Sequence, residues 1–313
     1  MTNISLKDDI SQITARAPAT LSNLAIGFDI IGVALQAPHD QVTLKRRQDR
    51  LLVIQDIQSP TPLPLDPNKN TATIALRSML DACQLSTGFD VFIKKGIDCG
   101  SGMGGSAASA VAAVVAANAF LNQPLNNAAL LTHAVEAERI TSGSAHCDNA
   151  APCLNGGLVL CQNNQQVTPL PSPSGTLIIT KPSIAISTKQ ARQLLPNAVP
   201  FTDITQQNSH LANWVHALHL RDNQTMAKHM VDLIVEPKRQ SLWPHYQPIK
   251  RAAQNAGALM SCMSGSGPTV VSWCDDSHCE DVKEAIEHHC EQQDYDYQVW
   301  LSSWSARGAH IEE

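Results

Sequence analysis

Residues 100–109 read Gly-Ser-Gly-Met-Gly-Gly-Ser-Ala-Ala-Ser, and the eight residues that follow are all Ala or Val. Four glycines within six residues let the backbone turn tightly and direct successive N–H groups into one concavity. The Ala-rich run predicts a helix that begins at the end of this turn. Because the first N–H groups of a helix lack partners and the helix dipole attracts negative charge there, this stretch predicts a phosphate-binding site.

Two common phosphate-binding folds share part of this pattern. Residues 100–105 satisfy the Gly-x-Gly-x-x-Gly spacing of dinucleotide-binding folds, but those folds place an acid about twenty residues later. The first acid after Gly105 is Glu136, which is too distant, and no Lys follows the glycines as a Walker P-loop requires. A purely structural glycine turn is the remaining alternative. Ser106 favours a functional interpretation, because its hydroxyl could reach a metal ion held by nucleotide phosphates.

The composition is that of a globular protein with a substantial core. The chain has 313 residues, 43% of them hydrophobic and 16% charged, which is enough for two domains of ordinary size. A formal net charge of −6 disfavours a nucleic-acid partner. No apolar stretch is long enough for a membrane span, and the polar start of the chain does not resemble a secretion signal. Nine cysteines without such a signal predict reduced thiols in the cytoplasm.

The order of the expected elements indicates an α+β protein. In the first half we expect strands within 12–57 and at 89–97 and 157–161, helices at 70–84, 105–121 and 126–140, and a loop at 142–154. In the second half we expect strands at 176–180, 258–263, 269–273 and 295–302, and helices at 188–195, 203–221, 223–235, 245–256 and 278–291. The polar, Pro-containing segment 162–175 predicts a boundary between domains at 1–165 and 166–313.

Three further segments place polar residues in patterns typical of binding sites. Residues 18–29 contain Asn23 and Asp29 between two β segments, and residues 264–269 form a Ser-Gly-Ser-Gly-Pro-Thr turn. Residues 136–149 combine Glu138, which could complete a Mg²⁺ site with Ser106, with His146, Asp148 and Asn149, which could bind a polar substrate. Each segment also has a plain structural interpretation, as a polar loop, a hairpin turn or a solvated helix end.

A cluster of Cys and His residues near the end of the chain carries a weaker signal. It comprises Cys274, His278, Cys279, His288, His289 and Cys290. The irregular spacing does not match the paired ligands of a zinc site, so an amphipathic helix is the favoured interpretation.

The glycine stretch and the 264–269 turn together resemble the motifs of the GHMP family of small-molecule kinases. That family's central motif, Pro-x-Gly-x-Gly-Leu-Gly-Ser-Ser-Ala-Ala, is closely followed by residues 98–108, and its final motif, Ile-Ser-Gly-Ser-Gly-Pro-Thr, corresponds to residues 263–269. Two such motifs in this order form a specific signal, and the resemblance covers nearly the whole chain. The family includes galactokinase, homoserine kinase, mevalonate kinase and phosphomevalonate kinase.

Within this family the chain is most similar to the homoserine kinase branch. The opening Pro-Ala-Thr-x-x-Asn-x-x-x-Gly-Phe-Asp at 18–29 resembles that branch. So do the string Ser-Gly-Ser-x-His-x-Asp-Asn-x-Ala-Pro-Cys-x-x-Gly-Gly at 142–157 and the segments 185–196 and 236–239. Mevalonate and galactose kinases resemble the chain only at the glycine and Ser-Gly-Ser-Gly motifs.

The resemblance implies a two-domain GHMP kinase fold with ATP bound between the domains. The N-terminal domain would be ribosomal-protein-S5-like, with a left-handed β-α-β unit, and the C-terminal domain ferredoxin-like. A left-handed crossover is an exception to a strong rule, and we expect it on the resemblance alone. A homodimer is the common state in this family.

The resemblance also assigns residues to MgATP and to L-homoserine as the phosphoryl acceptor. Ser106 and Glu138 match the Mg²⁺ ligands. Nucleotide-binding positions are matched by Asn70, Gly100, Ser101, Gly102, Met103, Gly104, Gly105 and Ser106. The amino-acid pocket is matched by Asn23, Asp29, His146, Asp148, Asn149, Thr188, Arg192 and Arg239. In such a pocket an acid suits the ammonium of the substrate and arginines suit its carboxylate.

Phosphoryl transfer requires mainly positioning and charge stabilisation, because its transition state is loose. The resemblance implies that Asn149 orients the acceptor hydroxyl. Asp148 would be a clamp for the substrate ammonium, which we favour, or a catalytic base in the manner of mevalonate kinase. Two other functions stay open: a GHMP kinase for another small alcohol, and a non-catalytic nucleotide-binding sensor on the same fold.

Two positions depart from the family motif. Asp98 stands where the motif has Pro, and Gly105 where it has the first Ser. A carboxylate beside the phosphate loop is expected to repel ATP unless it points away or is paired. Gly105 keeps the backbone N–H but lacks a hydroxyl. We therefore expect activity with weakened nucleotide affinity.

Overall fold

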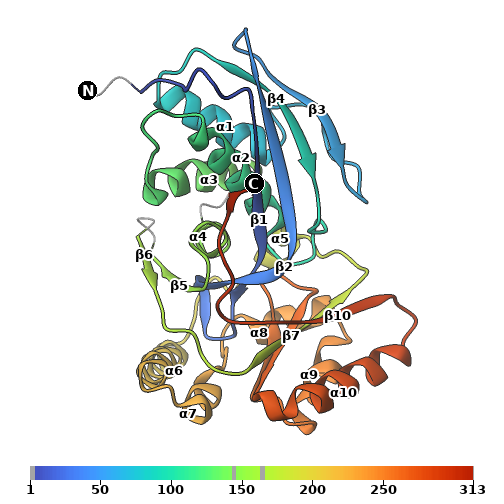
Figure 1. The fold of residues 1–313 in the computed structure, drawn as a ribbon. Coiled ribbons are helices and arrows are strands. Elements are labelled where there is room, and N and C mark those ends of the chain that lie inside the picture. Colours follow the sequence, from blue (N-terminus) through green and yellow to red (C-terminus); the bar gives the residue numbers. More distant parts are fainter. Residues whose placement is uncertain (1–3, 143–145, 163–165, 313) are drawn as a thin grey trace.

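A computed structural model describes residues 4–142, 146–162 and 166–312 (Figure 1). The strands are β1 (Gln12–Asn23), β2 (Gly27–Arg47), β3 (Leu52–Gln58), β4 (Gly88–Lys94), β5 (Leu158–Cys161), β6 (Val167–Pro169), β7 (Thr176–Pro182), β8 (Met260–Met263), β9 (Val270–Cys274), β10 (Tyr297–Ser302) and β11 (His310–Ile311). The α-helices are α1 (Thr71–Ala82), α2 (Gly105–Ala119), α3 (Asn127–Ser142), α4 (Ala150–Asn155), α5 (Thr188–Gln193), α6 (Phe201–Leu220), α7 (Asn223–His229), α8 (Glu236–Arg239), α9 (Tyr246–Asn255) and α10 (Cys279–Glu291). Two short 3₁₀ helices, η1 (Gln240–Leu242) and η2 (Asp276–His278), precede α9 and α10.

The first sheet is built on the long antiparallel hairpin of β1 and β2. Its strand order is β11-β1-β2-β4-β3, and β5 with β6 extends it at the other end of β2. β2 reaches both groups of strands, because residues 41–47 pair with β4 and residues 31–33 pair with β5. β3 and β4 are parallel and α1 connects them, which is the parallel β-α-β unit to which the left-handed expectation refers. Helices α1, α2 and α3 stack against one side of this sheet (Figure 1).

Helix α2 is buried along most of its length, and its composition explains how. Its residues from 107 to 117 are small, almost all Ala or Val, and nearly all are inaccessible to solvent. Small side chains let a helix approach its neighbours closely, so α2 packs against α1, α3 and the strands β1 and β2 at once. Gly104, the residue before the helix, has a left-handed φ of 65°, and it provides no side chain to cap the first turn. The uncapped N-terminus faces the site described below.

The second sheet is antiparallel, with strand order β10-β7-β9-β8. Read along the chain, β7, the helices up to α9, β8, β9, α10 and β10 form the β-α-β-β-α-β arrangement of a ferredoxin-like domain, as expected. Side chains on a strand alternate between faces. Accordingly Leu177 and Ile179 join the core shared with the first sheet, whereas Ile178 packs in a second core with α9 and α10.

The two halves of the chain are not separated in the first sheet. β6 lies after the predicted boundary at 165/166 but pairs with β5, and β11 at the end of the chain pairs with β1. The position of the domain boundary therefore stays a prediction. In the described part of the chain, no helix combines the length and apolar character that crossing a membrane requires.

Most expected elements are confirmed, and the differences fall on short elements. The loop expected at 142–154 is wrong in part, because α4 occupies residues 150–155, with Pro152 in its first turn, where proline is tolerated. The helix expected at 223–235 ends at His229. β6, α8 and β11 were not expected, since two to four residues carry too little periodicity to predict an element. Cys274, Cys279 and Cys290 of the Cys/His cluster pack in the second core.

Candidate active site

A cavity of about 340 Å³ lies between the glycine loop, the first turn of α2 and the 264–267 turn of the second sheet. Every residue nominated from the sequence except Met103 lines it. These lining residues are Asn23, Asp29, Asn70, Gly100, Ser101, Gly102, Gly104, Gly105, Ser106, Glu138, His146, Asp148, Asn149, Thr188, Arg192 and Arg239. Met103 instead packs in the core, and its carbonyl oxygen accepts a hydrogen bond from the Thr20 N–H at 3.1 Å. Gly143 and Ser144 of the quoted motif lie outside the described residues.

Glycine is required at two positions of the loop, because neighbouring atoms leave no room for a side chain. Gly102 has a left-handed φ of 80°, and a Cβ there would lie 2.6 Å from the carbonyl oxygen of Ser264. A Cβ on Gly104 would lie 2.2 Å from Oγ1 of Thr20. The hydroxyl of Ser264 donates to the Gly102 carbonyl oxygen at 2.6 Å. The loop is thus held between β1 and the second sheet, and it lines the cavity.

A buried ion pair, which the sequence reasoning missed, fixes the base of the loop. Lys95 follows β4 and pairs with Asp40 of β2, and both side chains are almost fully buried. The Lys95 ammonium also donates to the Gly105 carbonyl oxygen at 2.6 Å and to Oγ of Ser109 at 2.9 Å. Asp40 Oδ1 accepts from the two backbone N–H groups that follow Lys95, each at 3.1 Å. Each charge is therefore compensated, as burial demands.

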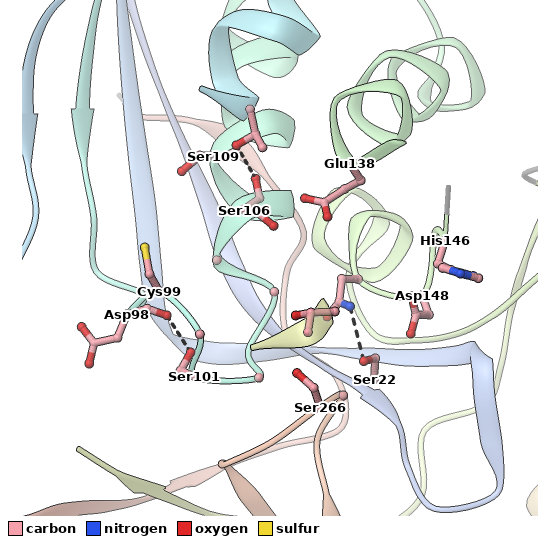
Figure 2. Close-up of a pocket in the computed structure, with 18 of the residues that line it drawn as sticks. Ser22, Asp98, Cys99, Ser101, Ser106, Ser109, Glu138, His146, Asp148 and Ser266 are labelled. Carbon is pink, nitrogen blue, oxygen red and sulfur yellow. Dashed lines mark hydrogen bonds between the residues drawn. The ribbon is translucent and has the colours of Figure 1, made fainter. Parts of the chain in front are cut away.

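Ser106 and Glu138 form the part of the site that suits a metal ion. Figure 2 shows the Glu138 carboxylate on α3 directed toward Ser106 in the first turn of α2. Burial raises the pKa of Glu138, against the opposing effects of the Ser106 hydroxyl hydrogen bond and the nearby Lys95 charge. A hydroxyl and a carboxylate oxygen, with the rest of the sphere left to phosphates and water, are a donor set that Mg²⁺ accepts. These residues therefore fit a phosphate-bound Mg²⁺.

Charged side chains from three distant segments meet at the other end of the cavity. Asp29, in the β1–β2 hairpin, accepts hydrogen bonds from both terminal nitrogens of Arg192 on α5, at 3.0 and 3.2 Å. Nδ1 of His146 lies 3.4 Å from Oδ2 of the same carboxylate. Burial lowers the pKa of His146, with the Asp29 charge acting in the opposite direction. Asn23 orients Asp29, because its Oδ1 accepts from the Asp29 N–H at 3.0 Å.

A second arginine joins this group from the short helix α8. Arg239 is buried, donates to the Gly265 carbonyl oxygen at 2.9 Å, and lies with its guanidinium 5.0 Å from the centre of the Phe28 ring. Arg192 lies 6.0 Å from the same ring. Stacking on an aromatic face is a favourable environment for a guanidinium. The cavity is thus lined by two arginines that could bind an anionic group.

Asp148 and Asn149 lie between the two ends of the cavity, just before α4. Asp148 is buried, and burial together with the Asp29 charge raises its pKa to about 7, while Ser22 and Arg192 act in the opposite direction. The amide of Asn149 accepts from Oγ1 of Thr20 at 2.9 Å and donates to Oγ of Ser22 at 3.3 Å (Figure 2). Asn149 is thereby held in one orientation beside the glycine loop.

Several lining residues were not nominated from the sequence. They are Ser22, Leu63, Pro64, Lys69, Thr71, Ile93, Lys95, Asp98, Cys99, Ser109, Gly265 and Ser266. Gly265 and Ser266 belong to the 264–269 turn that was recognised as a motif, and Asp98 had been noted only as a departure. Leu63 and Pro64 belong to the Pro-rich connection before α1, where no periodicity marks a residue as functional.

The two departures from the family motif have different surroundings. Asp98 is paired with Lys181. Pairing was one of the two conditions under which a carboxylate beside the phosphate loop would not repel ATP. Gly105 has limited space, because a Cβ there would lie 3.1 Å from Cγ2 of Ile97. A serine at this position would need a small shift of that side chain.

Comparisons with known proteins agree on one family. Residues 70–157 match the family model for the GHMP kinases N terminal domain, and residues 214–292 match that for GHMP kinases C terminal. A homoserine kinase of Xylella fastidiosa (strain M12) is 35% identical over 305 residues, which cover 96% of this chain and 94% of that protein. One of Chlorobaculum tepidum is 34% identical over 320 residues, covering 96% and 98%.

Solved structures support the same grouping. The crystal structure of homoserine kinase from Cytophaga hutchinsonii aligns with a TM-score of 0.93 at 32% identity, covering 98% of this chain and 99% of that one. The L. major mevalonate kinase structure aligns with a TM-score of 0.72 at 16% identity, which indicates a shared fold alone.

Asp148 gives the folded protein a characteristic pH dependence. The pKa of Asp148 is about 7 in the folded protein and 3.8 for an unperturbed, solvent-exposed carboxyl. Between these pH values the folded state keeps a proton that the unfolded state has lost. Rising pH therefore destabilises the fold through this residue. We expect Asp148→Asn to become more stable relative to the parent between pH 4.5 and 8, by about 3 kcal/mol, measured by urea unfolding.

A control with the opposite sign is available on α7. Hydrogen bonds from Thr225 lower the pKa of exposed Asp222, so Asp222→Asn should lose relative stability as pH rises through the acid range. A stability difference for Asp148→Asn that stays constant with pH would contradict the assignment.

Proposed function

This chain belongs to the GHMP kinase family, and on that premise we propose that it transfers the terminal phosphoryl group of ATP to the side-chain hydroxyl of L-homoserine. The product is O-phospho-L-homoserine, on the route to threonine. One observation carries the assignment: a single cavity joins an uncapped helix N-terminus to a pocket with both carboxylates and arginines. This pattern matches an anionic polyphosphate at one end and a zwitterionic amino acid at the other.

The phosphate end of the cavity suits ATP. The backbone of the glycine loop lines the cavity and leads into the first turn of α2, whose free N–H groups attract anions. Asn70 caps α1, with its Oδ1 accepting from the Ala72 N–H at 3.0 Å, and it lines the same cavity. We assign the loop to the phosphates and Asn70 to the nucleoside side.

We assign Ser106 and Glu138 to Mg²⁺. When bound, the ion would neutralise negative charge on the phosphates during transfer. The Glu138 carboxylate is held beside the loop by α3, and Ser106 is held by the start of α2, so the two oxygens are preorganised.

The amino-acid end supplies a partner for each group of L-homoserine. Arg192 and Arg239 would bind the carboxylate, and Asp148 the ammonium, with Asn23, Asp29, His146 and Thr188 shaping the pocket. Asn149 would orient the hydroxyl toward the phosphates. A cation beside Asp148 favours its ionised form, so substrate binding near pH 7 would release a proton. Its pKa near 7 also suits the alternative role of a base.

Two alternative functions differ from this proposal, one in the acceptor alcohol and one in the absence of catalysis. A GHMP kinase for a neutral alcohol such as galactose would need no carboxylate-binding arginines, and one for mevalonate would need no acid for an ammonium, whereas Arg192, Arg239 and Asp148 all line the cavity. A non-catalytic sensor would need no Ser106–Glu138 pair, which is present here. We place the protein in the cytoplasm, without a nucleic-acid or membrane partner; a homodimer would follow the family habit.

The substrate is tested by acceptor-dependent ADP release. With MgATP, we expect kcat/KM for L-homoserine to exceed that for mevalonate or galactose by at least about 100-fold, because mevalonate offers no ammonium to Asp148 and galactose offers neither an ammonium nor a carboxylate. A higher rate with either alcohol would establish the first alternative. Nucleotide binding without ADP release on any acceptor would establish the sensor.

The metal assignment is tested on α3, which carries two glutamates of different placement. Glu138→Ala removes the carboxylate beside Ser106 and should lower kcat by at least about 100-fold with an unchanged circular dichroism spectrum. Glu136→Ala is the matched control, since Glu136 pairs with Arg139 on the surface and does not line the cavity. A Glu138→Ala enzyme as active as the control would refute the metal site.

A further inference from the structure

An ion pair joins the two sheets at the rim of the cavity. The ammonium of Lys181, near the end of β7, contacts the carboxylate of Asp98, which precedes the glycine loop. The Lys181 side chain is 8% exposed and that of Asp98 is 41% exposed. The pair lies where core meets solvent, so its charges are screened less than charges in bulk water.

Each partner is fixed by a different part of the fold. Lys181 also donates to Oε1 of Gln298 on the neighbouring strand β10, at 3.4 Å, which ties the ammonium to the second sheet. The carbonyl oxygen of Asp98 accepts from the Ser101 hydroxyl at 2.8 Å, which ties this residue to the loop. Asp98 lines the cavity, and in Figure 2 its carboxylate points away from Ser106 and Glu138. The carboxylate is thus close to the phosphate cradle but turned toward Lys181.

We propose that Lys181 is a positioning residue for the nucleotide, which acts through Asp98 by neutralising the carboxylate at the rim of the phosphate cradle and thereby sets the affinity for ATP. This inference rests on the proposed function, because it places polyphosphate at the N-terminus of α2. With both partners present, the rim is close to neutral. Without Lys181 the carboxylate repels the nucleotide, and without Asp98 the ammonium attracts it.

Opposite shifts in nucleotide affinity distinguish this role from a structural one. Lys181→Met keeps most of the apolar stem but leaves Asp98 uncompensated, and it should raise the Kd for a fluorescent MgATP analogue about threefold to fivefold. Asp98→Asn should lower that Kd by a similar factor, and the double variant should return near the parent value. Both shifts should shrink as salt rises, while kcat at saturating ATP stays constant.

The titrations need no acceptor alcohol, so they are independent of substrate identity. Asp90→Asn is the control, because it breaks the Arg47–Asp90 pair, which joins β2 to β4 outside the cavity and is also partly exposed. It should leave the Kd unchanged. If both single variants weaken binding, or neither changes it, the inference is overturned and the pair is only a bridge between sheets. If the parent protein binds no nucleotide, the proposed function fails, and this inference with it.

Discussion

The backbone of the glycine loop lies against the turn at residues 264–267, and this close approach joins the phosphate end of the cavity to its amino-acid end. Gly102 accepts a hydrogen bond from Ser264 at 2.6 Å, and no side chain larger than glycine fits there. Asn23 and Arg239 both donate to the Gly265 carbonyl oxygen. The contact that closes the phosphate cradle therefore also positions two residues of the amino-acid pocket.

Several buried charged residues lie around this contact, and each is compensated by different groups. Asp40 and Lys95 satisfy each other and the loop backbone, so their burial yields rigidity. Arg239 is satisfied by a carbonyl oxygen and an aromatic face. Ser22 and Arg192 compensate Asp148 only in part, so burial and the Asp29 charge raise its pKa to about 7. A site that leaves one acid under-compensated is prepared to receive a cation, which agrees with an amino-acid substrate.

The sequence could predict those features that depend on local pattern. Gly100–Ser106 indicated a loop and a helix N-terminus because glycine spacing and Ala-rich periodicity are local properties, and both were confirmed. The family motifs located more than half of the residues that line the cavity. Lys95 and Lys181 could not be predicted, because their partners, Asp40 and Asp98, are brought near by strand pairing far along the chain. Met103 was nominated by motif position, yet its side chain points into the core.

A crystal structure with a non-hydrolysable ATP analogue, Mg²⁺ and L-homoserine tests the central claim most directly. The account predicts phosphates on the backbone of residues 100–106, the ion between Ser106 and Glu138, and the amino-acid carboxylate at Arg192 and Arg239. A nucleotide bound outside this cavity, or an acceptor whose hydroxyl lies away from Asn149, would contradict it.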